Sequence, residues 1–375
     1  MRWSVTLGAI RGIKIKIHAT FLLIIPWAAY NWGLVLGRGW QGALYGIALT
    51  VAIFACVVLH ELAHSLVARF YGVQVREIEL SPIGGLAKLD SIPQKAYQEF
   101  VMALVGPVAN LLTAVPLGVL TLILVQSGSI KSFGHLLYLM RRPSWQGLIL
   151  NLLAANVFLA LFNLLPAFPM DGGRVLRSAL SRSVGHREAT RLAALVGQWL
   201  SGTMGLIGLF DGNLLLTLMA AFVFLSAQQE ARMTEMQATL GNLRVTEALI
   251  ILWPALSTED TVDTVVGRAM HGQPAPFPVV EGGVIMGLVT TADATAALET
   301  YGPGARVGDI MRRQFPLLSV SDSLARANQL MASSGLPALP VAEDGRLLGM
   351  VSVQQIEQIY SLLSAQEQQS EGLRL

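Results

Sequence analysis

The stretch AIFACVVLHELAHSLVARF, residues 52–70, carries the sharpest chemical signal in the sequence, because its apolar run ends in His60-Glu61-Leu-Ala-His64. Positions four apart share one face of a helix, so this spacing predicts that both imidazoles bind one metal ion. Glu61 lies beside them and is predicted to take a proton from a water whose pKa zinc lowers from about 15.7 to about 7. Three ionisable residues at the end of an apolar helix are costly, which favours a functional site over a chance match.

The composition around this stretch indicates a chain that spans a membrane. Of the 375 residues, 53% are hydrophobic and 13% charged, whereas a typical soluble domain has about 25% charged residues. The mean hydropathy is +0.55. A formal net charge of +2 gives no indication of nucleic-acid binding. The single cysteine, Cys56, excludes a disulfide within the chain and is predicted to be a small core residue.

Six apolar blocks have the length of membrane helices, which need about 20 residues each. Basic residues precede the first block, as in a signal peptide, but further apolar blocks follow and no small-residue cleavage site stands out. A retained helix is therefore predicted there. The blocks cover residues 19–36, 43–66, 99–125, 147–165, 191–210 and 213–229.

The Lys and Arg residues between the blocks predict the orientation, because cytoplasmic loops carry the excess of positive charge. One side has thirteen: Arg2, Arg11, Lys14, Lys16, Arg69, Arg76, Lys88, Lys95, Arg174, Arg177, Arg182, Arg187 and Arg191. The other side has four: Arg38, Lys131, Arg141 and Arg142. Both termini and the polar tail are therefore predicted to be cytoplasmic.

Two segments outside the blocks favour β-structure. In residues 1–18, isoleucines alternate with lysines, which is typical of a strand or an interfacial segment. In residues 73–89, a strand, the turn Ser81-Pro-Ile-Gly84-Gly85 and a return strand predict a small hairpin beside the membrane.

Asp171 is the predicted third metal ligand, since a catalytic zinc keeps one open position beside three protein ligands. It ends the segment NLLPAFPMD, residues 163–171, whose two prolines break the helix. Irregular backbone at membrane depth is tolerated where it lines a cavity. Two alternatives stay open: Asp171 only caps the next helix, or His18 or His135 binds the metal instead.

Taken together, the two motifs resemble the site-2 protease family of intramembrane metalloproteases, and the resemblance covers nearly the whole chain. The zinc ligands that it implies are His60, His64 and Asp171. It implies that Glu61 is the catalytic base and that Asn163 acts near the scissile bond, as an oxyanion or substrate donor. Further matches to the family are Gly106-Pro107 and Asn110, while Met170 replaces the leucine that the family often has at that position.

The resemblance also implies the substrate, a membrane-spanning protein cut within or next to its transmembrane segment (regulated intramembrane proteolysis). A helix shields its own peptide bonds, so the substrate must unwind locally. An extended substrate is predicted to pair with the edge of the hairpin by strand addition. Gly84 and Gly85 would allow close backbone approach there, although an ordinary turn is the alternative.

Residues 244–363 contain an internal repeat. VIMGLVT, residues 284–290, matches RLLGMVS, residues 346–352, about 62 positions later, and a helical stretch follows each. This repeated β-β-α unit resembles a pair of CBS (cystathionine-β-synthase) domains. The predicted domains are a transmembrane metalloprotease domain (1–229), a linker (230–243), CBS domain 1 (244–303), CBS domain 2 (304–363) and a disordered tail (364–375).

CBS pairs often bind adenine nucleotides between their repeats, so ATP, ADP or AMP is a predicted ligand. Thr290, Thr291 and Asp293 follow the second strand of the first repeat and would supply a ribose-binding carboxylate. The second repeat has Ser352 but Gln355 where the Asp would stand. The alternative is a structural module that forms a homodimer through the CBS pair.

The predicted fold is a multi-pass α-helical membrane protein of about six transmembrane helices with a small membrane-associated β-hairpin, followed by an α+β cytoplasmic CBS-domain pair. One rival function is a transporter or channel, which would need polar groups spread along several helices. The other is a membrane metalloprotease of another family that cuts soluble peptides. Such enzymes tend to use a Glu as third ligand, which Asp171 in its proline-rich segment argues against.

Overall fold

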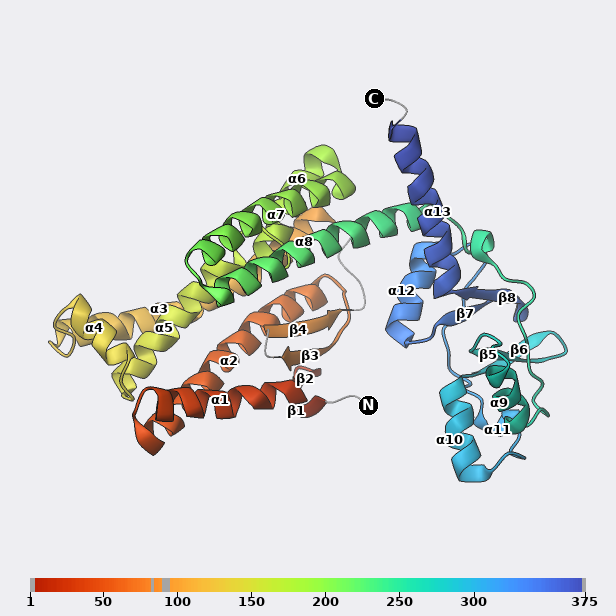
Figure 1. Cartoon of the computed structure of the whole chain (residues 1–375), viewed down its shortest axis with the longest axis horizontal. Helices are drawn as coiled ribbons and strands as arrows, with labels where there is room; N and C mark the ends of the chain where they lie inside the picture. The colour runs from red at the N-terminus through yellow and green to blue at the C-terminus, as the bar shows by residue number, and fades with distance from the viewer. Residues whose placement is uncertain (1–3, 82–83, 90–94, 373–375) are drawn as a thin grey trace. The chain divides into compact units, whose positions relative to one another are not determined.

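The computed structural model describes residues 4–81, 84–89 and 95–372. Two compact units divide the chain, an N-terminal unit of residues Met1–Ala231 and a C-terminal unit of residues Arg232–Leu375. The N-terminal unit is mostly helical, and the C-terminal unit is built around a sheet (Figure 1). The boundary between the two units falls inside the predicted linker, residues 230–243.

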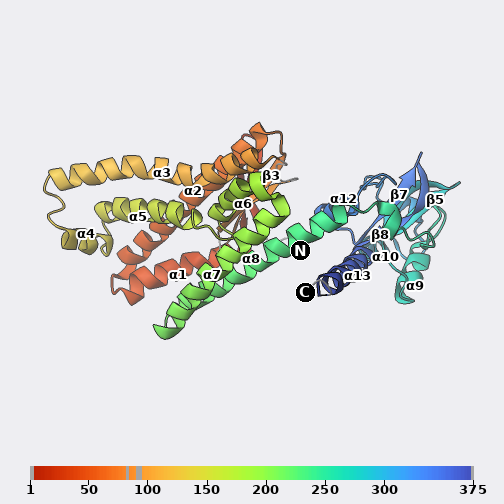
Figure 2. The same ribbon diagram turned by 90° about the horizontal axis from the view of Figure 1, so that it is seen from above.

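Within the described residues, five helices are long and apolar enough to cross a membrane. They correspond to five of the six predicted blocks, and α3 and α5 lie side by side (Figure 2). The five helices are α2 (Gly39–Phe70), α3 (Ala96–Gln126), α5 (Trp145–Asn163), α7 (His186–Phe210) and α8 (Leu214–Gly241).

The first predicted block, residues 19–36, forms a shorter and irregular apolar helix, Ala19–Val35. His18 caps its start and Gly37, with a φ of 65°, ends it in a left-handed conformation. The block then packs along α2, where a Cβ atom at Gly46 would lie 2.7 Å from Ala28 O. Its parts are η1 (Ala19–Leu23, 3-10), α1 (Ile24–Tyr30) and η2 (Asn31–Val35, π).

The β-structure of the N-terminal unit is larger than the predicted hairpin. The predicted N-terminal strand and hairpin join in one sheet of order β1-β2-β3-β4, in which β2 and β3 are parallel and Ile15 pairs with Ile78. The alternation of apolar and charged residues explains this arrangement. The two isoleucines pack in one core with Ala68 of α2, while Lys16 forms an ion pair with Glu77. The strands are β1 (Ser4–Ile10), β2 (Ile13–His18), β3 (Val75–Ser81) and β4 (Gly84–Leu89).

Two short helices connect the spans of the N-terminal unit. α4 (Phe133–Met140) follows α3, and α6 (Asp171–Val184) follows α5 after the irregular segment 164–170. α6 packs against α3 and α7. Two glycines allow the start of α6 to fold back on that segment, because Cβ atoms there would lie 2.2 Å from Leu165 O at Gly172 and 2.8 Å from Ala167 C at Gly173.

The C-terminal unit confirms the internal repeat. Each repeat gives one hairpin to a sheet of order β5-β6-β8-β7, and each hairpin has a register shift at the same place, after Val279 in β5 and after Val341 in β7. The strands are β5 (Phe277–Glu281), β6 (Val284–Val289), β7 (Ala338–Glu343) and β8 (Arg346–Ser352). The helices are η3 (Val245–Ala248), α9 (Val262–Met270), α10 (Thr291–Tyr301), α11 (Val307–Ile310), α12 (Leu324–Ser334) and α13 (Val353–Gly372).

The predicted linker and tail are helical where the structure describes them. α8 continues without a break through most of residues 230–243, and α13 continues past residue 364 to Gly372. The linker is rich in Ala, Glu and Met and the tail in Gln and Glu, all of which are good helix formers, and proline is absent from both segments. Polar composition indicated disorder in the tail, but helix propensity favours continuation of the preceding helix.

Candidate metal centre and active site

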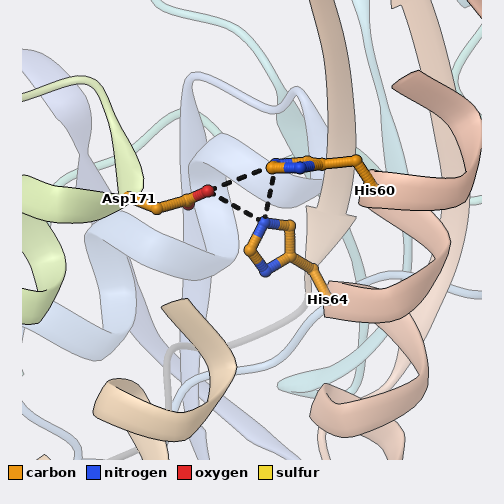
Figure 3. A group of neighbouring side chains, drawn as sticks. All are labelled: His60, His64 and Asp171. Carbon is orange, nitrogen blue, oxygen red and sulfur yellow. Dashed lines mark hydrogen bonds and ion pairs between the residues drawn. The ribbon is translucent and has the colours of Figure 1, made fainter. Parts of the chain in front are cut away.

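The helix α2 presents two imidazoles on one face. His60 and His64 are four positions apart, and both rings project from α2 toward Asp171 (Figure 3). The Nε2 atoms of His60 and His64 are 3.1 Å apart. Because neither side chain is more than 14% exposed, the pair lies in the interior of the helical unit.

Asp171 reaches the histidines from α6. It is the first residue of that helix, and its side chain makes no cap, since the N-cap position is Met170 without a side-chain hydrogen bond. Instead, Asp171 Oδ2 lies 3.2 Å from His60 Nε2 and 3.1 Å from His64 Nε2. The alternative in which Asp171 only caps the helix is therefore not the arrangement found.

The three donor atoms fit a zinc ion. Their separations of 3.1, 3.1 and 3.2 Å form a nearly equilateral triangle. Ligands about 2.0–2.1 Å from a tetrahedral zinc are about 3.3 Å apart, close to these distances. Two nitrogens and one carboxylate oxygen are also a common catalytic donor set, which leaves the fourth position open. Among the described residues, these three are the group of His, Cys, Asp and Glu side chains that meets the geometry of a metal site.

Hydrogen bonds hold both imidazoles by their other nitrogen. His64 Nδ1 donates to the carbonyl oxygen of Met102 at 2.6 Å, so Nε2 is free to bind a metal. His60 Nδ1 lies 3.1 Å from Asn110 Nδ2, while Asn110 Oδ1 is buried and has no partner among the described residues. Turning the amide of Asn110 by half a rotation lets Oδ1 accept from His60 Nδ1 and satisfies both groups.

Close packing of α3 against α2 depends on Gly106. A Cβ atom there would lie 2.2 Å from His64 Nε2 and 2.7 Å from His60 Cε1. This is the physical reason for the glycine in the predicted Gly106-Pro107 pattern, since any side chain would displace the imidazoles. The carbonyl of Met102 and the packing of Gly106 were not predictable as contacts, because both require knowledge of how α3 lies on α2.

Glu61 lies beside the triangle and under the sheet. Its carboxyl group interacts electrostatically with His60, His64 and Asp171. A Cβ atom at Gly85 would lie 2.4 Å from Glu61 Cγ, so β4 passes directly over this side chain. The order of the sheet places β4 at its edge. The predicted base and the predicted substrate strand therefore meet at one place.

The other predicted site residues of the N-terminal unit lie as follows. Asn163 is the last residue of α5, and its Nδ2 donates to Leu159 O at 3.0 Å. His18 caps η1 by accepting from Thr20 N, and His135 lies on α4. Neither alternative histidine belongs to the metal-binding group. Gly84 pairs with Ser81 in the first step of the β3–β4 ladder, next to Gly85.

The predicted nucleotide residues cap helices at equivalent places in the two repeats. Thr290 and Asp293 form a capping box at the start of α10, and Ser352 Oγ accepts from Gln355 N at the start of α13. Thr291 is the first residue of α10. Their nucleotide binding stays a prediction, and the sequence did not indicate that Arg312 contacts Asp293.

Arg312 holds the carboxylate of Asp293 with two hydrogen bonds, of 2.8 Å to Oδ2 and 2.7 Å to Oδ1. Burial alone would raise the pKa of Asp293, but hydrogen bonds from Arg312 and Thr290 outweigh it and hold the pKa below its usual value. The same pairing raises the pKa of Arg312. A nucleotide hydroxyl at Asp293 would have to share or displace these bonds.

Fold and site together define a metalloprotease whose metal centre lies among apolar helices. Residues 48–204 match peptidase family M50, and residues 307–360 match the CBS domain. A zinc metalloprotease of Methanocaldococcus jannaschii is 32% identical over 373 residues, which cover 98% of this chain and 99% of that protein. A Synechocystis protein with a provisional zinc metalloprotease name is 27% identical over 374 residues, 94% of each chain.

Among solved structures, a site-2 protease from Methanocaldococcus jannaschii is 36% identical, with a TM-score of 0.43, and the match covers 61% of this chain and 96% of that chain. The chain belongs to the site-2 protease family, peptidase family M50, and carries a C-terminal CBS module. Members of this family are zinc metalloproteases that are embedded in the membrane.

Proposed function

We propose that this chain hydrolyses a peptide bond within or next to the transmembrane segment of a membrane-protein substrate. The observation that carries the proposal is the triangle of His60 Nε2, His64 Nε2 and Asp171 Oδ2, which lies on and between apolar helices with Glu61 beside it. A metal site in this position suits a substrate that approaches from the lipid bilayer.

The chemistry is divided between the metal and Glu61. Zinc, when bound, supplies a Lewis acid that makes water nucleophilic near neutral pH. Glu61 lies close enough to His60, His64 and Asp171 to interact with them, but it is not one of the three ligands. It therefore accepts the proton of the attacking water and delivers it to the leaving amine.

Asn163 is proposed as a donor to the substrate carbonyl. It ends α5, immediately before the segment 164–170 that leads to Asp171. Its Nδ2 carries two hydrogens, one of which goes to Leu159 O. The second hydrogen would donate to the oxygen on which charge develops as the peptide bond is attacked.

Strand β4 is proposed to bind the substrate. A strand at the edge of a sheet presents backbone N–H and C=O groups that an extended peptide can pair with. Gly85 of this strand lies over Glu61, so a substrate strand added beside Gly84 and Gly85 would pass close to the base. An unwound transmembrane segment satisfies its backbone groups in this way.

Both termini are proposed to face the cytoplasm. The shared sheet supports this orientation, because its pairing of β2 with β3 places the basic segments before η1 and after α2 on one side. The excess of Lys and Arg belongs to that side. The connections at Arg38, at 127–144 and at 211–213 would then be extracytoplasmic.

The CBS module is proposed to bind an adenine nucleotide at Thr290, Thr291 and Asp293, with Ser352 as the weaker equivalent in the second repeat. Support comes from the matching helix starts of the two repeats and from the CBS match at residues 307–360. Nucleotide binding would modulate cleavage. A homodimer through the module is a further proposal, and it predicts that the full chain sediments as a dimer at micromolar concentration.

The test uses the full chain reconstituted in lipid vesicles with two matched substrates. One carries a test sequence in a transmembrane segment, and the other is a soluble peptide of the same sequence. Cleavage of the first alone, and none by Glu61→Gln, is expected. Equal cleavage of both substrates would instead favour a metalloprotease that acts on soluble peptides.

A further inference from the structure

A buried ion cluster lies outside the reacting groups, centred on Arg177 of α6. Arg177 and Glu99 of α3 are each only 2% exposed. Arg177 Nε donates to Glu99 Oε1 at 2.9 Å, and Nη2 donates to the same oxygen. Arg177 Nη1 donates to Glu230 Oε1 of α8 at 2.6 Å. One guanidinium thus joins three helices.

The same guanidinium also packs on the segment that leads to the metal ligand. It stacks over Phe168, with 5.0 Å between Cζ and the ring centroid. Phe168 is buried in a cluster with alanines of α7 and α8, and it lies three residues before Asp171 in the irregular segment 164–170. Arg177 therefore touches both sides of Asp171 along the chain, the helix that follows it and the segment that precedes it.

Nothing in the chemistry of peptide hydrolysis uses these charges, yet burying them is costly. A buried charge persists where partners satisfy it, and removal of one partner leaves the other uncompensated. The planar fork of arginine suits this place, because its separate nitrogens serve two carboxylates and its face meets an aromatic ring. A lysine has a single nitrogen and cannot make this set of contacts.

We propose that Arg177, held by Glu99 and Glu230, is a positioning residue that fixes the zinc ligand Asp171 against His60 and His64. A ligand at the first residue of a helix, after irregular backbone, has no regular structure before it to set its place. The cluster supplies that restraint by tying α6 to α3, the helix that also carries Met102 and Gly106 against the histidines.

The proposal rests on the metal site of the proposed function and is tested by zinc affinity rather than by cleavage. The zinc dissociation constant of the purified full chain is measured by competition with a chromogenic chelator, and cobalt absorption reports the coordination geometry. Arg177→Lys and Glu99→Gln should weaken zinc binding by about 10–100-fold, as loss of groups that orient ligands does. They should also alter the cobalt spectrum.

Two controls separate positioning from general stability. Arg182→Lys changes an exposed arginine of the same helix, and Leu150→Ala removes core packing on α5 in a cluster that shares no residue with the metal site. Both should keep the wild-type zinc affinity, although Leu150→Ala lowers the unfolding temperature. Glu230→Gln is the mild variant, since its side chain is 33% exposed, and it should fold and bind zinc less tightly than the wild type.

The outcomes distinguish the two claims. Wild-type zinc affinity and cobalt spectra in Arg177→Lys, Glu99→Gln and Glu230→Gln, with only lower unfolding temperatures, would overturn the positioning role and leave a purely structural cluster. An unaltered chain that binds no zinc would overturn the metal site itself. Weaker binding that Leu150→Ala matches would also overturn the role, because it would follow stability.

Discussion

Asp171 Oδ2 lies 3.1 Å from His64 Nε2, although 107 residues separate them in the chain. The contact joins α6 to α2, so the metal centre exists only when the irregular segment 164–170 turns α6 back onto the first long helix. Two glycines allow the close packing around this contact, because Gly172 lets the start of α6 fold onto the segment before it and Gly106 lets α3 lie against the histidines. The site is therefore sensitive to changes that leave its ligands intact.

Gly106→Ala should weaken zinc binding although it replaces none of the ligands. The new Cβ atom would lie 2.2 Å from His64 Nε2, so the imidazole or α3 must move. We expect zinc binding to weaken by more than about 100-fold, the upper end for changes outside the ligand set. Gly118→Ala on the same helix is the matched control, because a Cβ atom there meets nothing within 4 Å. Unchanged affinity in Gly106→Ala would mean that α3 does not press on the histidines.

Gly85→Ala should impair cleavage but keep zinc. Its Cβ atom would lie 2.4 Å from Glu61 Cγ and would push the base aside. A displacement on the order of 1 Å can cost about 100-fold in rate, so kcat should fall by about that factor. Zinc content should stay at the wild-type value, since Glu61 is not a ligand. Gly8→Ala in β1, with open space around it, should behave as the wild type.

The topology prediction follows from the charge asymmetry of the connections. A reporter fused after residue 375 should read cytoplasmic, and one inserted at Gly128 should read extracytoplasmic. Gly128 suits an insertion, because a Cβ atom there would meet nothing within 4 Å. Reporters that both read cytoplasmic would show that α3 does not cross the bilayer as proposed.

Much of this site could be predicted because its signals are local. The spacing of His60 and His64 needs only helical geometry, and the two prolines before Asp171 mark broken backbone at the end of a span. The repeat in the C-terminal unit is likewise visible as matched strings. The helix that carries both histidines, the irregular segment 164–170 and the repeated hairpins were confirmed, because each depends on residues close together in the sequence.

The features that could not be predicted are long-range contacts, and one segment whose composition is compatible with two conformations. In the sequence, Arg177 counted only toward loop topology and Glu99 was the first residue of a predicted membrane block, whereas packing buries both as a pair. The charge count put both segments on one side of the membrane, but the parallel pairing of β2 with β3 is a long-range contact that it did not indicate. The helical tail was missed because residues after 364 are polar, which is compatible with disorder and with an exposed helix alike.

Asp293→Ala should weaken nucleotide binding and abolish its effect on cleavage, with zinc unchanged. Isothermal titration of AMP and ATP into the full chain measures binding, and the cleavage rate with and without nucleotide measures coupling. That coupling should be on the order of 1–3 kcal/mol, since allosteric couplings are typically of that size. Gln355→Ala is the matched change in the second repeat and should matter less. An absence of binding at millimolar nucleotide would leave the module with a structural or dimerising role.

The central claim is that His60, His64 and Asp171 hold zinc while Glu61 acts on the water. The most direct measurement is zinc content and cleavage of a membrane-tethered substrate in Glu61→Gln and Asp171→Ala, side by side. Glu61→Gln should keep roughly one zinc per chain and lose cleavage, whereas Asp171→Ala should lose both, because only the second removes a ligand. Wild-type zinc content and full activity in Asp171→Ala would contradict the account.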